Sequence, residues 1–299
     1  MSIFLTGATG FVGSSILRTL RAQGREVTAL ARNASKAEEV EALGAVAVIG
    51  ELSDTELLTA QAIASDGVIH VASPGDASSA SLDDAFVTAI FAGLEGSDKP
   101  YVHTGGIWVF GDGDAITEES PQNPPALTAW RSAIEKRVLE AEGVKTTVIM
   151  PGIVYGYGSG IPNVVVDAPR IVGDNGLEAL QLVGSGDAHW TTVYVDDLAD
   201  LYVAAFDLAA AGSVYLGVGG ENPSTRELGV AASIAAGLDG RVVPSSVDDV
   251  HARIGEAFGD ALLLDQQATG SAARIDLGWE PNGPSLIDEL RTGSYAPGH

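Results

Sequence analysis

Short apolar runs alternate with amphipathic segments through the first half of the chain. Their length and β-branched content predict strands at residues 3–5, 27–30, 46–49, 68–72, 101–103 and 147–150. Apolar residues at helical spacing predict helices near residues 11–23, 35–43, 54–63, 81–93 and 128–142. Alternating strands and helices indicate βαβ units with right-handed crossovers. We therefore predict an α/β fold built on a doubly wound parallel sheet.

The pattern changes in the second half. Residues 151–186 are rich in Gly and Pro, which predicts loops with short elements. After them, we predict a strand at 193–195 and a helix at 197–209 that return the chain to the sheet. From about residue 217 the chain has the pattern of a small, mostly helical lobe. We assign residues 1–152 and 187–216 to a dinucleotide-binding domain. We assign residues 153–186 and 217–299 to a substrate lobe with cleft loops.

Three glycines lie between the first strand and the first helix. Gly7, Gly10 and Gly13 have the G-x-x-G-x-x-G spacing of a phosphate-binding turn. Gly7 permits the tight turn, Gly10 lets the backbone approach a pyrophosphate, and Gly13 allows close packing of helix on strand. The positive end of the helix dipole would then face the phosphates. The alternative is a glycine-rich turn without a ligand.

Composition narrows the class of protein. The 299 residues carry a net charge of −24 and contain no cysteine, which excludes disulfides and thiolate chemistry. Acidic residues are spread over both halves, so we expect a solvated acidic surface and no nucleic-acid partner. No apolar run is long enough to span a membrane, and no secretory signal is recognised at the N-terminus. We expect a cytoplasmic protein.

Further motifs occur along almost the full length. They are Thr6-Gly7-Ala8-Thr9-Gly10-Phe11-Val12-Gly13, Val71-Ala72, Val109-Phe110-Gly111, Pro151-Gly152-Ile153-Val154-Tyr155-Gly156, Val193-Tyr194-Val195-Asp196-Asp197-Leu198-Ala199 and Leu277-Gly278-Trp279-Glu280-Pro281. In this order they resemble the extended short-chain dehydrogenase/reductase superfamily, of the NAD(P)-dependent epimerase/dehydratase type. The resemblance implies a Rossmann fold, a nicotinamide cofactor and, often, a homodimer formed through helices that flank the sheet.

The resemblance and the glycine turn together indicate the cofactor contacts. The predicted contacts are Gly7, Thr9, Gly10, Phe11, Val12, Gly13, Arg32, Asn33, Lys36, Glu51, Leu52, Val71, Ala72, Arg131 and Pro151. Ala31-Arg32 replaces the acid that binds the ribose of NAD, and a guanidinium can hold a 2′-phosphate, so NADP(H) is predicted over NAD(H). Arg32 could instead be a solvated turn residue, and Glu51 a helix-leading acid.

The usual catalytic residues of the superfamily are absent. Relatives use Tyr-x-x-x-Lys with a Ser or Thr, but no lysine of this chain has a tyrosine four residues before it. When the helix near 128–142 is aligned with the helix that carries Tyr-x-x-x-Lys in the superfamily, Leu127 falls at the Tyr position and Arg131 at the Lys position. Gly106 occupies the Ser position. Arg131 can hold ribose hydroxyls, but it stays charged and cannot relay a proton.

Three other residues are candidates for contact with the substrate or for proton donation. Thr104 ends the fifth strand, where ligands bind above a parallel sheet. Tyr157 lies in the loop after the sixth strand, although we favour the alternative that it is a loop aromatic packed on the lobe. His189 precedes the strand at 193–195 and could titrate near neutral pH, or be an exposed loop residue. Trp108 and Trp130 could line the cleft or lie in the core, and we favour the core for Trp130.

These observations give three functional hypotheses. The first is an NADP(H)-binding oxidoreductase that acts on a carbonyl-type small molecule without the Tyr/Lys pair. The second is a sugar-nucleotide epimerase or dehydratase, and the third a non-catalytic regulator that senses NADP(H). No His-Glu-x-x-His or other metal-ligand motif appears, so no metal site is predicted.

Overall fold

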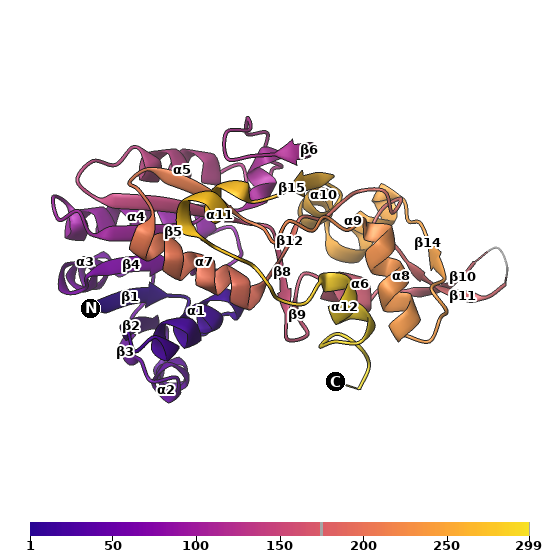
Figure 1. Cartoon of the computed structure of the whole chain (residues 1–299), viewed down its shortest axis with the longest axis horizontal. Helices are drawn as coiled ribbons and strands as arrows, with labels where there is room; N and C mark the ends of the chain where they lie inside the picture. The colour runs from indigo at the N-terminus through magenta and orange to yellow at the C-terminus, as the bar shows by residue number, and fades with distance from the viewer. Residues whose placement is uncertain (174–175, 299) are drawn as a thin grey trace.

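A seven-stranded parallel sheet forms the larger part of the molecule (Figure 1). The computed structural model describes residues 1–173 and 176–298. The strand order is β13-β7-β5-β4-β1-β2-β3. Their bounds are β1 Ser2–Thr6, β2 Glu26–Ala31, β3 Val46–Ile49, β4 Gly67–His70, β5 Pro100–Thr104, β7 Lys145–Pro151 and β13 Ser213–Gly217. The predicted doubly wound α/β fold is confirmed.

Helices cover both faces of this sheet. One face carries α1 Phe11–Ala22, α2 Ala34–Ala42, α7 Val195–Leu208 and α11 Ser271–Leu277, and the other carries α3 Thr55–Ala64, α4 Ser79–Leu94 and α5 Arg131–Leu139. In β1, Ile3 and Leu5 pack toward α1 and α7, while Phe4 packs toward the opposite layer. Because both faces are buried there, the central strand β1 carries the continuous apolar run Ile3-Phe4-Leu5.

The direction of strand addition reverses beside β1. The chain adds β2 and β3 on one side of β1 and then crosses to add β4, β5 and β7 on the other. The register pairs Thr6 of β1 with His70 of β4, so both strands end together. Loops diverge from such a reversal point and leave a crevice at the carboxyl ends of the strands, which is where ligands bind in open α/β sheets.

The predicted return of residues 193–195 to the main sheet is wrong. These residues lie in β12 Thr192–Tyr194, which pairs with β8 Ile153–Gly156 in a separate small sheet that also holds β9 Ser159–Gly160. The chain passes from β12 directly into α7, which delivers it to β13 at the edge beside β7. The edge position is therefore filled by the apolar run 214–216, which the pattern analysis did not recognise as a strand.

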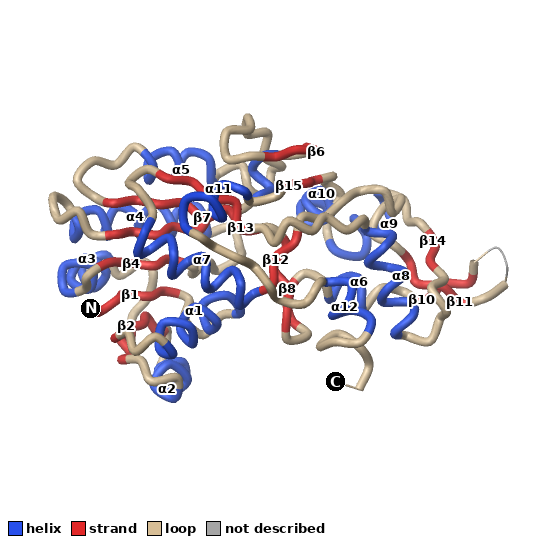
Figure 2. The backbone as a smooth tube through the Cα atoms, in the orientation of Figure 1, coloured by secondary structure: helices blue, strands red, loops and turns tan. Residues whose placement is uncertain are grey.

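A smaller lobe has a hydrophobic core of its own, centred on residues such as Leu228, Leu262 and Leu290. It is mostly helix and loop (Figure 2). Its helices are α6 Asn163–Val166, α8 Thr225–Ala235, α9 Val247–Ile254, α10 Glu256–Leu262 and α12 Leu286–Arg291, and its sheet is β10 Arg170–Val172, β11 Glu178–Gln181 and β14 Val242–Val243. A two-stranded pairing of β6 Gly113–Ile116 with β15 Gln266–Ala268, and a 3₁₀ turn at Ile107–Phe110, lie between lobe and sheet.

The C-terminal part of the chain returns to the main sheet before it ends in the lobe. Trp279 is buried in the core beside α7, and its indole N–H donates to the Asp197 carbonyl at 2.7 Å. The Asp197 carboxylate accepts the backbone N–H groups of Asn282 and Gly283 at 3.1 and 2.9 Å. Residues 271–279 thus pack with the dinucleotide-binding domain, although they fall inside the range 217–299 assigned to the lobe. The predicted domain limits stay a prediction.

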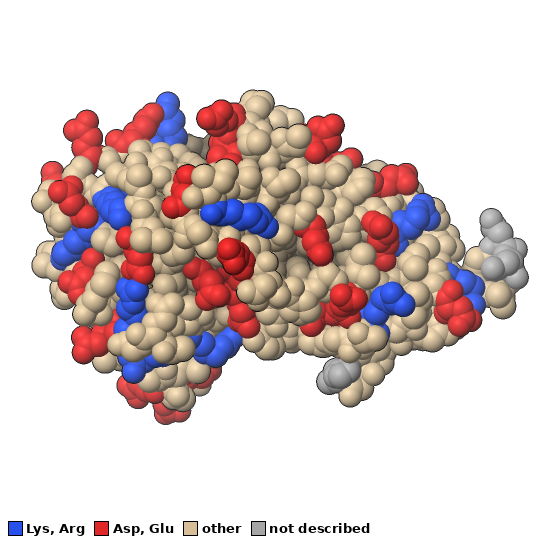
Figure 3. Space-filling model, viewed as in Figure 1, with Lys and Arg blue, Asp and Glu red and all other residues tan. Residues whose placement is uncertain are grey.

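Acidic side chains are scattered over the face seen in Figure 3, with fewer basic ones between them. This distribution agrees with the net charge of −24. Among the residues that the structure describes, no helix is long and apolar enough to cross a membrane.

Candidate cofactor and substrate site

The glycine turn after β1 leaves no room for side chains. A Cβ on Gly7 would lie 2.9 Å from the backbone nitrogen of Ala72, and a Cβ on Gly13 would lie 2.0 Å from the carbonyl oxygen of Gly7. Gly7 also has φ = +76°, a conformation that L side chains rarely adopt. The turn therefore packs against the loop after β4 and against its own helix through backbone atoms alone.

The N-terminus of α1 is open to a ligand. Gly10 is its N-cap residue and provides no side-chain cap, and the first turn of the helix contains no acidic residue. The first N–H groups of an α-helix have no partner inside the helix. Together with the helix dipole, they suit the pyrophosphate of a dinucleotide. The residues present thus fit the cofactor that the glycine motif predicts.

A cavity of about 490 Å³ extends from this turn toward the end of β2. Many of the predicted cofactor contacts line it, namely Gly7, Thr9, Gly10, Arg32, Lys36, Glu51, Leu52, Val71 and Ala72. Phe11, Val12 and Gly13 form the first turn of α1 and are not among the lining residues. Asn33 is the N-cap of α2, and its side chain accepts the Lys36 backbone N–H at 3.0 Å. The Lys36 ammonium is paired with Glu39 at 2.8 Å, whereas Arg32 is exposed.

A second cavity, of about 800 Å³, lies above the ends of β5 and β7. Its walls are largely apolar and aromatic, with Ile107, Trp108, Leu127, Trp130, Ile161 and Phe258. Arg131, Pro151 and the Gly105-Gly106 backbone also line it. Phe258 comes from α10, so the lobe supplies part of the wall. We call this cavity the cleft.

The two cavities are joined by a small space of about 30 Å³ at the ends of β4 and β5. Ser73 lines all three cavities, and Arg131 lines both the cleft and the small space. The three cavities therefore adjoin in a row from Arg32, past the glycine turn, to the aromatic cleft, and we call this row the groove. This is the path that a dinucleotide takes across the reversal point of an α/β sheet.

Thr104 lies at the small space between the cavities, but its hydroxyl is engaged within the protein. Its oxygen donates to the His70 carbonyl at 2.6 Å and lies 2.7 Å from the Tyr202 hydroxyl. A carbonyl can only accept, so the one proton of Thr104 is directed at His70. Its role as a substrate contact stays a prediction.

Tyr157 lies away from the cleft. Its side chain is 56% exposed, its hydroxyl donates to the Asp196 carboxylate, and the Arg18 guanidinium lies 5.6 Å from its ring centre. It is absent from the residues that line the cleft. Tyr157 has φ = +51°, so the loop turns sharply there. These contacts join the loop to α1 and α7 and leave the catalytic role of Tyr157 without a geometric basis.

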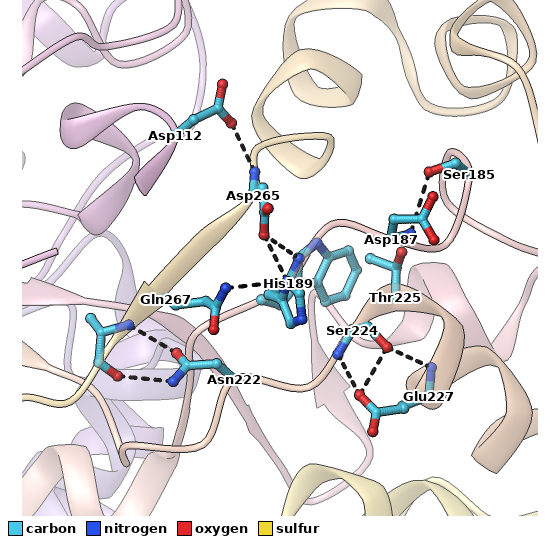
Figure 4. A network of polar contacts seen from close by, with 12 residues as sticks. Asp112, Ser185, Asp187, His189, Asn222, Ser224, Thr225, Glu227, Asp265 and Gln267 are labelled. Carbon is cyan, nitrogen blue, oxygen red and sulfur yellow. Dashed lines mark hydrogen bonds and ion pairs between the residues drawn. The ribbon is translucent and has the colours of Figure 1, made fainter. Parts of the chain in front are cut away.

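His189 belongs to a polar network between the lobe and the β6–β15 pair (Figure 4). Its Nδ1 and its backbone N–H both lie 2.8 Å from Oδ1 of Asp265, and Gln267 lies 3.5 Å from the ring. The backbone N–H of Asp265 in turn donates to the Asp112 carboxylate at 2.8 Å. His189 is not a lining residue of the cleft. The structure thus does not bring Thr104, Tyr157 and His189 together.

Two polar residues near the cleft were missed by the sequence analysis. The hydroxyl of Thr128 is buried, and within the described residues it has no hydrogen-bond partner, although Thr128 lines the cleft. Glu135 of α5 is 1% exposed and lies beneath Gly105. Arg131 and Glu135 lie on one face of α5 at i and i+4, and Thr128 lies in the turn before this helix, three residues ahead of Arg131. That spacing was the available signal.

Of the two tryptophans considered in the sequence analysis, Trp130 does not lie where we expected it. Trp130, which we expected in the core, is only partly buried and lines both the cleft and the small space. The Arg131 guanidinium lies 4.5 Å from its ring centre, and the same guanidinium donates to the Thr104 carbonyl at 3.0 Å. Trp108 lines the cleft beside Phe258. Stacking on Trp130 holds Arg131 at the junction of the two cavities.

Comparison with known families agrees with this geometry. Residues 3–216 match the model of the NAD dependent epimerase/dehydratase family. The chain belongs to this family. The match covers the sheet, the glycine turn and the strand ends that line the groove.

Relatives span nearly the whole chain. An uncharacterised protein of Schizosaccharomyces pombe is 29% identical over 99% of this chain and 100% of its own length. A 4-hydroxy-2-methyl-3-oxo-4-farnesyl-3,4-dihydroquinoline-1-oxide ketoreductase of Stigmatella aurantiaca is 25% identical over 92% of this chain and 85% of its own. Among solved structures, a UDP-glucose 4-epimerase of Thermus thermophilus in complex with NAD has a TM-score of 0.74 at 21% identity, covering 100% and 99% of the two chains. At 21% sequence identity, this similarity shows a shared fold and nothing about function.

The paired glycines at the end of β5 allow a matched test of the cleft geometry. A Cβ on Gly105 would lie 2.6 Å from Oε1 of Glu135 and 2.4 Å from Sδ of Met150, whereas a Cβ on Gly106 meets nothing within 4 Å. We predict that Gly105→Ser lowers the free energy of unfolding by about 2 kcal/mol through overpacking. Gly106→Ser should change it by less than about 0.5 kcal/mol. Urea unfolding of both variants measures the difference, and equal values would contradict the placement of Glu135.

A second prediction concerns pH. Burial raises the pKa of Glu135 to about 7, against the opposing charge of Arg131 and the hydrogen bond from Gln122. The folded state then holds a proton that the unfolded chain releases near its ordinary pKa of 4.5, so this group makes stability fall as pH rises from about 4.5 to 7. Glu135→Gln should remove that loss. Relative to the wild type, it should gain up to about 3 kcal/mol between pH 5 and pH 8.

The check on Glu135 is urea unfolding of both proteins across this pH range. Glu140→Gln, at the exposed C-cap residue of the same helix, serves as the control and should show a flat difference. A flat difference for Glu135→Gln as well would mean that Glu135 is ionised in the folded protein throughout.

Proposed function

We propose that this protein binds NADP(H) and is an oxidoreductase that moves a hydride to or from an apolar, carbonyl-type small molecule. The observation that carries the proposal is the groove, the row of adjoining cavities from the glycine turn and Arg32 to the aromatic cleft. One end of the groove has the chemistry of a dinucleotide site, and the other has that of a small-molecule site.

The preference for NADP(H) rests on the residues after β2. Arg32 is exposed at the cavity that begins at the glycine turn, and Lys36 adds a second cation there. A planar guanidinium binds phosphate through two parallel hydrogen bonds. Glu51 also lines this cavity, but it follows β3, not β2, so it does not occupy the position of the NAD-type acid.

The substrate class rests on the walls of the cleft. Apolar and aromatic side chains dominate, and Arg131 is the one basic residue among those that line it. A sugar nucleotide carries a diphosphate, which needs several cationic or N–H donors. An apolar ketone needs a dry wall and a few polar contacts at its carbonyl. The Stigmatella ketoreductase, whose name describes a farnesylated ketone, supports the same choice.

Thr128 and Arg131 are the polar groups placed to hold the substrate oxygen. Both residues line the cleft, and both carry a donor: the Arg131 guanidinium and the Thr128 hydroxyl, which is buried and has no hydrogen-bond partner among the described residues. Bound reduced nicotinamide supplies the hydride. The two donors would stabilise the negative charge that develops on the carbonyl oxygen, and water in the cleft would supply the proton. This assignment replaces the Tyr/Lys pair with donors that position the substrate but do not titrate.

The cofactor preference can be measured directly. We expect NADPH to bind more tightly than NADH, and Arg32→Ala to weaken NADPH binding about tenfold, or about 1.4 kcal/mol, with NADH binding nearly unchanged. Fluorescence titration gives both dissociation constants. Arg291→Ala, in α12 of the lobe, is the matched control. Equal affinity for the two cofactors in the wild type would contradict the assignment to NADP(H).

Turnover tests the reaction. With NADPH, a panel of alkyl and aryl ketones and aldehydes should be reduced, seen as loss of nicotinamide absorbance, and UDP-glucose should not be consumed. Thr128→Val should lower kcat about 100-fold while the dissociation constant of NADPH stays the same. Conversion of UDP-glucose would favour the epimerase hypothesis. Tight NADPH binding without turnover of any compound would favour the sensing regulator.

A further inference from the structure

Three metal-ligand side chains meet in the layer between α4 and the sheet. His70 ends β4, His103 lies near the end of β5, and Asp83 lies on α4. Their exposed fractions are 2%, 1% and 8%, so all three are buried. None of them holds a role in the proposed function. Imidazole and carboxylate groups seldom gather in a core at random, because burying them costs free energy.

The donor atoms of the three residues converge. Nε2 of His70 lies 2.9 Å from Oδ1 of Asp83, and Nε2 of His103 lies 3.6 Å from Oδ2. One donor atom from each residue lies within 4.8 Å of the others. The strand register explains the arrangement, since His70 pairs directly with His103 and both side chains reach Asp83 on α4. Bound zinc holds nitrogen and oxygen ligands at about 2.0 to 2.2 Å, so the three donor atoms would draw together around the ion.

The outer nitrogen of each imidazole is held by a hydroxyl. Thr6 Oγ1 lies 2.7 Å from Nδ1 of His70, and the Tyr101 hydroxyl lies 2.8 Å from Nδ1 of His103. A hydroxyl can donate or accept, so each ring is free to carry its proton on Nδ1 and offer the lone pair of Nε2. Metal-binding histidines are oriented by such a partner on the other ring nitrogen. Phe86, stacked on His70 at 3.8 Å, fixes that ring further.

One ligand atom is left without a hydrogen bond. Oδ2 of Asp83 is buried and has no hydrogen-bond partner among residues 1–173 and 176–298. Asp83 and His70 line the small space of about 30 Å³ between cofactor cavity and cleft, which is enough for one water molecule. A buried carboxylate oxygen without a partner is costly, and a cation bound beside it would remove that cost.

We propose that His70, Asp83 and His103 form a buried site for one divalent transition-metal ion of the zinc type, with water from the small space as the fourth ligand. Two imidazoles and one carboxylate with an open position are a donor set typical of zinc, and they disfavour Mg²⁺ and Ca²⁺, which prefer oxygen ligands. The ion would join α4 to β4 and β5 directly beneath the groove. The proposal does not depend on the proposed reaction or on the choice of cofactor.

The test uses the full chain and zinc or cobalt chloride alone. Because the site is buried, the protein is unfolded in urea with a chelator, freed of both, and refolded with or without the metal. We expect one Zn²⁺ per chain by native mass spectrometry and a higher midpoint of thermal unfolding in the metal-loaded protein. Co²⁺ should give the intense visible absorption of a four-coordinate nitrogen and oxygen site.

Variants assign the bound metal to these residues. Asp83→Asn and His103→Gln should each abolish the cobalt absorption and the thermal shift, with far-UV circular dichroism reporting whether each variant folds. The control is Asp260→Asn, which alters the exposed His251–Asp260 pair and should keep both signals.

Three results would overturn the proposal. They are a wild type that retains no metal after refolding, retention of one metal ion by both cluster variants, and loss of the signal in Asp260→Asn. The first result is measured on the wild type alone, so it would contradict the proposal even if a cluster variant fails to fold. It would assign the cluster to hydrogen bonding within the core.

Discussion

The close approach of two backbone segments at the glycine turn determines the rest of this site. Gly7 and Gly13 bring the turn, the start of α1 and the loop after β4 within van der Waals contact, with no side chain between them. This contact sets the position of the α1 N-terminus relative to the ends of β1 and β4. The groove, the small space and the cleft all follow from it, because each is lined by residues that leave those strand ends.

The family relationship and the chemistry of the cleft carry different information. The family match and the fold likeness concern the sheet and the dinucleotide groove, which many reactions share. Specificity belongs to the walls, and here Trp108, Trp130 and Phe258 make an apolar cleft with a single guanidinium. The proposed oxidoreductase, in which Thr128 and Arg131 position an apolar carbonyl, is compatible with both the retained groove and the absent Tyr-x-x-x-Lys.

Buried polar groups are concentrated around the ends of β4 and β5. Glu135 lies beneath Gly105 on one side, and the His70–Asp83–His103 cluster lies beneath the small space. Both occupy the layer covered by α4 and α5, whereas Thr104 points to the opposite layer and bonds to Tyr202 of α7. The two faces of the same strand ends therefore differ in chemistry, one rich in titratable groups and the other closed by hydroxyl contacts.

The linear pattern of the chain determined the sheet, the helices and the glycine turn, because each depends on residues close in sequence. Strand–helix alternation and three glycines were sufficient to place the dinucleotide groove, and Arg32 after β2 was visible as a departure from an acidic position. The edge strand β13 was missed because a short apolar run does not by itself show which strand it pairs with, here β7.

Only the tertiary structure decided which side chains meet. Tyr157 and His189 lie outside the cleft because loops direct them to Asp196 and Asp265. Trp130 lines the cleft because the turn before α5 opens there. His70, Asp83 and His103 are separated by 13 and 20 residues along the chain, and they converge only because the crossover helix α4 begins beside the ends of the parallel strands β4 and β5. Spacing along the chain reports local geometry, whereas a site assembled from several elements depends on register and packing.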